Sequence, residues 1–179
     1  MINSALLEVF YEYDYVTYYT VKLEIDQELE EFSETDKFYI QFDDPVHGYF
    51  GEFEKIVKVI DAIGCYSKGA ECGLFRFENA AHALPPTVKE AKRVFDIEII
   101  EHSELRLYCI RLTAQVVVLL NGGVKTSASA QDCPNVKEHF RLAQAVAKLI
   151  DSQLANGEIK IQGKEIINNT GDDDIIFHF

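Results

Sequence analysis

Two apolar runs separated by a short polar break constrain the fold of this chain more than any other feature. Residues 105–112 and 116–120 are rich in β-branched, aromatic and leucine side chains, and the second run stops at Gly122 and Gly123. Such runs are typical of two antiparallel strands joined by a tight connection. We therefore predict that residues 105–126 form a β-hairpin in the middle of a sheet. The two glycines lack the length and the Lys-Ser/Thr ending of a phosphate-binding loop, so we expect a bulge or bend there.

The spacing of apolar residues predicts the remaining elements. Helical spacing is found over residues 49–63 and 135–154, and a short helix is expected over 86–94. Alternation predicts strands over 16–25, 37–42 and 95–100, a short strand over 74–77 and a small hairpin over 159–167. Residues 26–34 are expected to begin a short helix, and residues 1–14 show no clear period. With no repeat or linker, one α+β domain over residues 1–179 is the simplest interpretation.

Length and composition limit the possible classes of protein. At 179 residues with 47% hydrophobic side chains, the chain can bury a core of its own. No apolar run is long enough to span a bilayer, and the acidic beginning is unlike a signal peptide, so we expect a cytoplasmic location without membrane contact. The four cysteines are scattered and expected to be reduced, with Cys109 buried in a strand. The histidines lack ligand spacing, so neither a metal nor another cofactor is expected.

The charge distribution singles out the same hairpin. The net charge is −13, which argues against a general nucleic-acid binder. Residues 1–101 hold 9 Lys and Arg against 21 Asp and Glu, whereas residues 102–156 hold 6 against 4, and residues 157–179 hold 2 against 5. The hairpin and the helix after it are therefore the only segment that is not acidic. A small positive site in a negative body could act on phosphate, although an ordinary fluctuation of charge along the chain remains an alternative.

Alternation along the first strand separates its polar side chains into two sets. Arg106 and Tyr108 are two residues apart and share one face, whereas Arg111 belongs to the other face. Lys125 follows the glycine pair at the end of the second strand. Each residue also has a structural interpretation: a strand arginine with its head in water, a core tyrosine, and a lysine at a loop end.

The pattern Arg106-Leu-Tyr108, then an apolar strand, Val124-Lys125-Thr126, Pro134 and a helix resembles the RelE/HigB/ParE superfamily of bacterial toxins. The resemblance is closest to the HigB-like, phage-Gp49-like branch. It covers residues 15–156 loosely and carries motifs only over 104–140. It implies a RelE/ParE-like α+β toxin fold, with an antiparallel sheet packed against helices and residues 157–179 as a C-terminal extension.

The resemblance also implies a function and a partner. The chain would be the toxin of a type II toxin–antitoxin system, a metal-independent endoribonuclease that cuts mRNA on the ribosome, held by a cognate helix-turn-helix antitoxin. By position, Arg106 and Lys125 match the family's basic residues and would stabilise charge on the phosphate. Tyr108 would lie beside them, His139 could serve as a general acid, and Lys137 and Arg141 could contact RNA phosphate. ParE-type members instead poison DNA gyrase.

Three departures from the family keep a second hypothesis open. The chain is far more acidic than a typical ribosome-binding toxin, its leading segment is long, and its end lacks the basic and aromatic residues that active RelE-type enzymes use. The alternative is a non-catalytic protein-binding module, or an inactive phage or mobile-element relative of the same fold. Its acidic surface and apolar tail would then bind a partner or a second copy of the chain as a homodimer.

Overall fold

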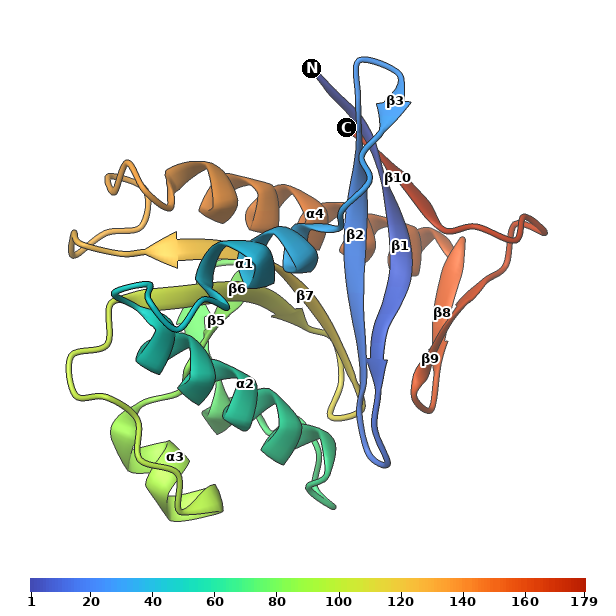
Figure 1. Cartoon of the computed structure of the whole chain (residues 1–179). Helices are drawn as coiled ribbons and strands as arrows, with labels where there is room; N and C mark the ends of the chain where they lie inside the picture. The colour runs from blue at the N-terminus through green and yellow to red at the C-terminus, as the bar shows by residue number, and fades with distance from the viewer.

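A computed structural model describes all 179 residues and shows an α+β fold built on one large mixed sheet (Figure 1). The helices are α1 (Glu34–Phe42), α2 (Phe50–Gly64), α3 (Val88–Phe95) and α4 (Lys137–Asn156). The first strands are β1 (Ile2–Glu12), β2 (Thr17–Ile25), β3 (Glu28–Leu29), β4 (Arg76–Glu78) and β5 (Ala81–Leu84). The later ones are β6 (Leu105–Arg111), β7 (Val116–Val124), β8 (Ile159–Gln162), β9 (Glu165–Asn168) and β10 (Ile176–His178). A short 3-10 turn spans Cys72–Leu74.

The central hairpin is confirmed. The strand order is β10-β1-β2-β7-β6-β5-β4, so the antiparallel pair β6–β7 lies in the interior of the sheet. The register shifts between the pairs Leu107–Gly122 and Cys109–Leu119, so a bulge is present, but it lies directly before the glycine pair and not at the glycines themselves. A Cβ atom on Gly122 would lie 1.8 Å from the carbonyl oxygen of Arg106. Only glycine therefore allows the two backbones to approach this closely beside the bulge.

The sheet is mixed rather than wholly antiparallel, which corrects the expectation. β2 and β7 run parallel, and they pair only over Thr17–Tyr19 and Val116–Val118. Figure 1 shows the two strands diverging beyond this point, with α1 lying at the gap between them. A bulge bends and twists the strand that contains it, so the irregularity in β7 contributes to this separation. The consequence is an opening in the sheet at the carboxyl ends of two parallel strands.

The two faces of the sheet carry separate cores. Tyr108 and Ile110 of β6 pack in the core under α4, whereas Leu107 and Cys109 pack in the core under α1 and α2. This confirms the alternation along β6 and the burial of Cys109. The helices predicted over 49–63, 86–94 and 135–154, the strand over 16–25 and the hairpin over 159–167 are also found, with shifted ends.

Four local predictions were wrong or incomplete. Residues 37–42 lie in α1 rather than in a strand, because Ser33 and Asp36 form a capping box that begins a helix. Phe38 and Phe42 lie one helix turn apart, and both are buried. Residues 26–33 form no helix: Asp26 and Gln27 adopt positive φ in the turn to β3. No strand is found over 96–100, since Asp96 ends α3 in a left-handed conformation. Residues 1–14, without a clear period, contain the long strand β1.

The C-terminal residues pack onto the sheet. The β8–β9 hairpin lies over one face, where the backbone N–H of Ile166 donates to the hydroxyl of Tyr19 at 3.0 Å. β10 then pairs with β1 and extends the edge of the sheet, burying Phe177. The apolar end of the chain is therefore part of the core. No helix of the fold is both long enough and apolar enough to cross a membrane.

Candidate functional site

Two basic residues of the central hairpin, Arg106 and Lys125, lie in a cluster of charged side chains at the end of that hairpin. We call Arg76, Glu78, Arg106 and Lys125 the hairpin-end cluster. Lys125 extends from the end of β7 to place its Nζ atom 3.7 Å from Oε1 of Glu78 in β4. Arg76 and Glu78 are two residues apart on β4 and so share a face. Lys125 is the cation paired with Glu78, whereas Arg76 donates to the carbonyl oxygens of Pro85 and Pro86.

Arg106 is only partly exposed and already has polar partners. Its guanidinium donates to the carbonyl oxygens of Ser103 and Leu105, each at 2.8 Å. Burial, with the neighbouring Arg76, lowers the pKa of Arg106 from its ordinary value, and Glu78 acts in the opposite direction. A delocalised guanidinium stays charged under such conditions, so Arg106 contributes positive charge and spare N–H donors to the cluster.

Tyr108 lies beside the cluster but is fully buried. Its ring packs edge-to-face against Phe140 of α4, with the ring centres 6.0 Å apart. Its hydroxyl is one of two buried side-chain groups without a hydrogen-bond partner, the other being Tyr39. Burial raises the pKa of Tyr108 well above its ordinary value, and the charge of Glu78 adds to this effect. Tyr108 is therefore a neutral, enclosed neighbour of Arg106.

Arg111 is kept apart from the cluster. It lies on the opposite face of β6, where its Nε atom donates to the carbonyl oxygen of Ala70. The prediction that Arg111 turns away from Arg106 is confirmed, but the guanidinium binds a loop of this chain instead of facing only solvent.

The other predicted residues belong to a different region, at the beginning of α4. His139 and Arg141 line a pocket of about 470 Å³ between α1, α4 and the opening of the sheet, whereas Lys137, the first residue of α4, does not line it. We call this cavity the α1–α4 pocket. Its polar lining is supplied by Glu34, Lys37, Asn121, Glu138, His139 and Arg141, and its apolar lining includes Leu23, Leu142 and Phe179. The structure thus does not bring His139 together with Arg106 and Lys125.

A buried polar group forms one wall of the α1–α4 pocket. Glu34 is only 3% exposed, and its carboxylate accepts hydrogen bonds from Lys37 at 2.6 Å and from the amide of Asn121 at 3.2 Å. Lys37 also pairs with Glu30. Asn121 in turn accepts a hydrogen bond from the backbone N–H of Gly122 at 2.7 Å. Each charge in this group therefore has a partner, as burial requires.

His139 faces this group from α4 without a hydrogen bond of its own. Burial lowers the pKa of His139 below its ordinary value; Glu34 and Glu138 oppose this change and Lys37 adds to it. The neutral imidazole is therefore favoured, and in that form one nitrogen can donate a hydrogen bond and the other can accept one. Arg141 pairs with Glu138 at 2.9 Å on the same helix.

Five functional candidates were missed by the sequence analysis: Arg76, Glu78, Glu34, Lys37 and Asn121. The Ser33-to-Asp36 spacing could have revealed the capping box that begins α1 and so places Glu34 and Lys37 on a helix. Asn121 interrupts an otherwise apolar strand, which is a signal of its own. Nothing local in the sequence relates Arg76 or Glu78 to Arg106, because their proximity depends on the pairing of β4, β5 and β6.

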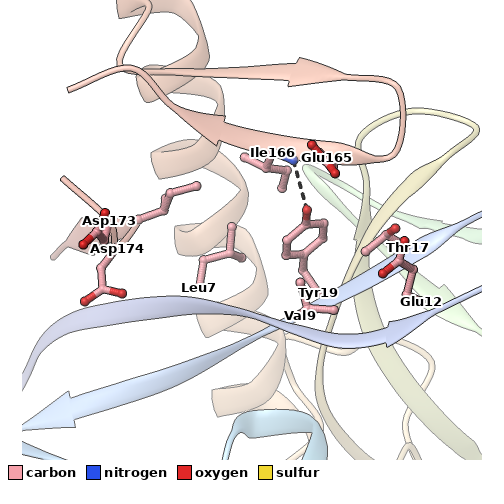
Figure 2. Close-up of a pocket in the computed structure, with 10 residues that line it drawn as sticks. Leu7, Val9, Glu12, Thr17, Tyr19, Glu165, Ile166, Asp173 and Asp174 are labelled. Atoms are coloured by element: carbon pink, nitrogen blue, oxygen red, sulfur yellow. Dashed lines mark hydrogen bonds between the residues drawn. The ribbon is translucent and has the colours of Figure 1, made fainter. Parts of the chain in front are cut away.

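A second hollow, of about 310 Å³, lies between the β8–β9 hairpin and strands β1 and β2 (Figure 2). Figure 2 shows Tyr19 rising from the sheet to meet Ile166, with Leu7 and Val9 beside it. Four carboxylates surround this apolar floor: Glu12, Glu165, Asp173 and Asp174. We call this hollow the C-terminal pocket. Its character is acidic, and only Glu12 among the four is paired, with Lys164 at 3.5 Å.

No group of three or more His, Cys, Asp or Glu side chains converges in an arrangement that could hold a metal ion. No protein-family model matches the chain, and no curated protein or solved structure is significantly similar to it.

Proposed function

We propose that this chain is an RNA-cleaving toxin of the RelE/HigB type, kept inactive by a partner antitoxin. The observation that carries the proposal is the hairpin-end cluster. Lys125, one of the two residues matched to the family's basic positions, pairs with Glu78, and the charges of Arg76 and Glu78 act on Arg106, the other. A positive cluster of this kind suits a phosphodiester, because arginine and lysine supply charge-assisted hydrogen bonds to phosphate oxygens.

The cluster offers a group for each step of metal-independent RNA cleavage. Glu78 would accept the proton of the 2′-hydroxyl as the 2′-oxygen bonds to phosphorus. Arg76 and Arg106 would stabilise the negative charge that develops on the phosphate oxygens. Lys125 would donate a proton to the 5′-oxygen as its bond to phosphorus breaks. Transfer of the proton from Glu78 back to Lys125, its neighbour at 3.7 Å, would restore the starting state.

Inducible expression in a bacterial host tests the proposal. The parent chain should arrest growth, and mapping of mRNA 5′ ends should reveal new cleavage sites. Glu78→Gln keeps the shape of the side chain but removes the base, so cleavage should fall by about a hundredfold. Arg106→Lys keeps a positive charge but loses the planar fork, and should also relieve the arrest.

The matched control is Lys148→Ala, which removes an exposed cation of α4 distant in sequence from the hairpin. This variant should arrest growth as the parent does. Circular dichroism of each purified variant shows whether it is folded. Normal growth and intact mRNA under verified expression of the parent chain would refute the proposal.

The C-terminal pocket favours a second candidate function, a non-catalytic module that binds a basic segment of another protein. Its apolar floor could pack against the methylene chain of a lysine or arginine side chain, while its carboxylates bind the charged end group. A lysine–serine peptide should then bind at low salt and lose affinity at high salt. The double variant D173K/D174K should lose that binding, while a glutamate–serine peptide should not bind either protein.

A further inference from the structure

The α1–α4 pocket has the size of a site for a small organic ligand. Its volume of about 470 Å³ falls within the range of ligand cavities, roughly 300–1,000 Å³. It lies where the parallel strands β2 and β7 separate at their carboxyl ends. By analogy with open α/β sheets, such an opening is where ligands bind, because strand ends and helix beginnings bring polar groups together there.

The charges of the pocket favour a neutral ligand. Its two cations already have carboxylate partners: Lys37 pairs with Glu34, and Arg141 pairs with Glu138. Lys37 also pairs with Glu30. A charged ligand would therefore have to compete with an existing ion pair, because the pocket offers no unpaired charge to bind it. A neutral molecule does not incur this cost.

The hydrogen-bonding capacity of the wall favours a flat, polar molecule. The carboxylate of Glu34 has lone pairs beyond those used by Lys37 and Asn121, so it can accept further N–H donors. Lys37 bonds two carboxylates and keeps a third N–H to donate. His139 has a free donor and a free acceptor. Leu23, Leu142 and Phe179 supply apolar surface for the faces of a ring.

We propose that the α1–α4 pocket binds a guanine base. Guanine presents neighbouring N–H donors, which suit Glu34, next to a carbonyl oxygen, which suits Lys37. Adenine presents one amino donor and one ring acceptor on that edge, so it would make one hydrogen bond to the carboxylate of Glu34 where guanine makes two. The identity of the ligand rests on the proposed function: the pocket would hold a base of the RNA.

The backbone geometry relates the pocket to the hairpin-end cluster. Asn121, in the wall of the pocket, is two residues from Gly123, which is the direct partner of Arg106 across the hairpin. Strand geometry therefore separates the backbone of Asn121 from that of Arg106 by about 8 Å, two residues along one strand and one strand across. This separation is comparable to the length of one nucleotide, so a base in the pocket and a phosphate at the cluster could belong to one RNA strand.

Calorimetric titration of the full chain with guanosine tests the proposal, with adenosine as the comparison. Guanosine should bind saturably and at least about tenfold more tightly than adenosine. His139→Ala removes a partner at the rim and Leu142→Trp fills the cavity, so each should weaken guanosine binding by at least about tenfold. Lys148→Ala, on the same helix but outside the pocket, should bind as the parent does. Amide NMR spectra of each variant verify the fold and should show guanosine-dependent shifts at Asn121 and Gly122.

The outcomes separate this inference from the proposed function. Absence of guanosine binding, equal binding of adenosine, or parent-like binding by folded Leu142→Trp would each overturn the guanine site whatever the chain does to RNA. The variant Arg106→Lys should retain guanosine binding in full even though it loses cleavage. A chain that binds guanosine but leaves growth and mRNA intact would retain the site while refuting the toxin.

Discussion

The amide of Asn121 in β7 donates a hydrogen bond of 3.2 Å to the buried carboxylate of Glu34 in α1. The two residues are 87 positions apart in the sequence, and the bond connects the helix to the strand where β7 separates from β2. Thr20 of β2 bonds to Thr35 of the same helix at 2.7 Å. The first turn of α1 is thus held by polar contacts to both strands at the opening of the sheet.

Replacing Glu34 with alanine should destabilise the fold strongly. The change leaves the amide of Asn121 buried without an acceptor and removes one of the two carboxylates that pair with Lys37. We expect a loss of about 2–4 kcal/mol in the free energy of unfolding, measured by urea denaturation. Glu31→Ala, at an exposed position just before α1, should change the same quantity by less than about 0.5 kcal/mol. A similar small effect at both positions would contradict the role of Glu34.

Replacing Gly122 with alanine should disrupt the central hairpin. The added Cβ atom would lie 1.8 Å from the carbonyl oxygen of Arg106 and 2.9 Å from the Cα atom of Leu107, so the two backbones would have to separate. We expect a loss of more than about 3 kcal/mol in the free energy of unfolding. Gly48→Ala is the matched control, because no atom lies within 4 Å of the added group. It should unfold within about 0.5 kcal/mol of the parent.

The central part of the fold could be predicted because its signals are local. The apolar runs at 105–112 and 116–120 and the glycine pair specify the hairpin and its bulge, and alternation places Tyr108 and Cys109 on opposite faces. The helix over 37–42 was missed because Phe38, Ile40 and Phe42 alternate as in a strand, whereas only Phe38 and Phe42 are buried and Ile40 is exposed on the other side of the helix. Its capping box, with Ser33 and Asp36 each bonding the other's backbone N–H, decides in favour of a helix.

The candidate sites could be predicted only in part because they depend on long-range pairing. Sequence matching found Arg106 and Lys125, but Glu78, the partner of Lys125, lies on β4, two strands from β6. His139 was found by its residue type alone. Its actual neighbours, Glu34 and Lys37, belong to a helix that the sequence suggested was partly a strand. A parallel pairing of β2 with β7 left no local pattern to detect.

Replacing Tyr108 with phenylalanine should leave stability unchanged or slightly higher. The buried hydroxyl has no hydrogen-bond partner, so its removal loses no bond and avoids the cost of keeping a polar group from water. We expect a change between zero and about 1 kcal/mol of added stability, measured by thermal and urea unfolding. Because the fold is preserved, a loss of RNA cleavage in Tyr108→Phe would report a chemical role of the hydroxyl. A clear loss of stability would indicate a bound water or another partner of that group.

Stability should decrease as the pH falls below about 6.5, the ordinary pKa of histidine. Burial lowers the pKa of His139, which the charges of Glu34, Lys37 and Glu138 also influence. Burial also lowers the pKa of His82, and the charge of Arg111 adds to this effect. The unfolded chain therefore binds protons at a pH where these folded histidines do not. A depressed pKa contributes stability that is present above the unfolded value and is lost as the pH falls toward the folded value.

Urea unfolding between pH 7.5 and pH 5 measures this loss. The slope can reach at most about 1.4 kcal/mol per pH unit for each histidine, and it should be near zero at the upper end of the range. His139→Gln and His82→Gln each remove one titrating group, so each should flatten the curve, and the double variant should be flatter than either. His178→Gln, at an exposed position in β10, is the control and should leave the slope as it is in the parent chain. A curve that is equally steep in the double variant would show that other groups, such as paired carboxylates, control the acid sensitivity.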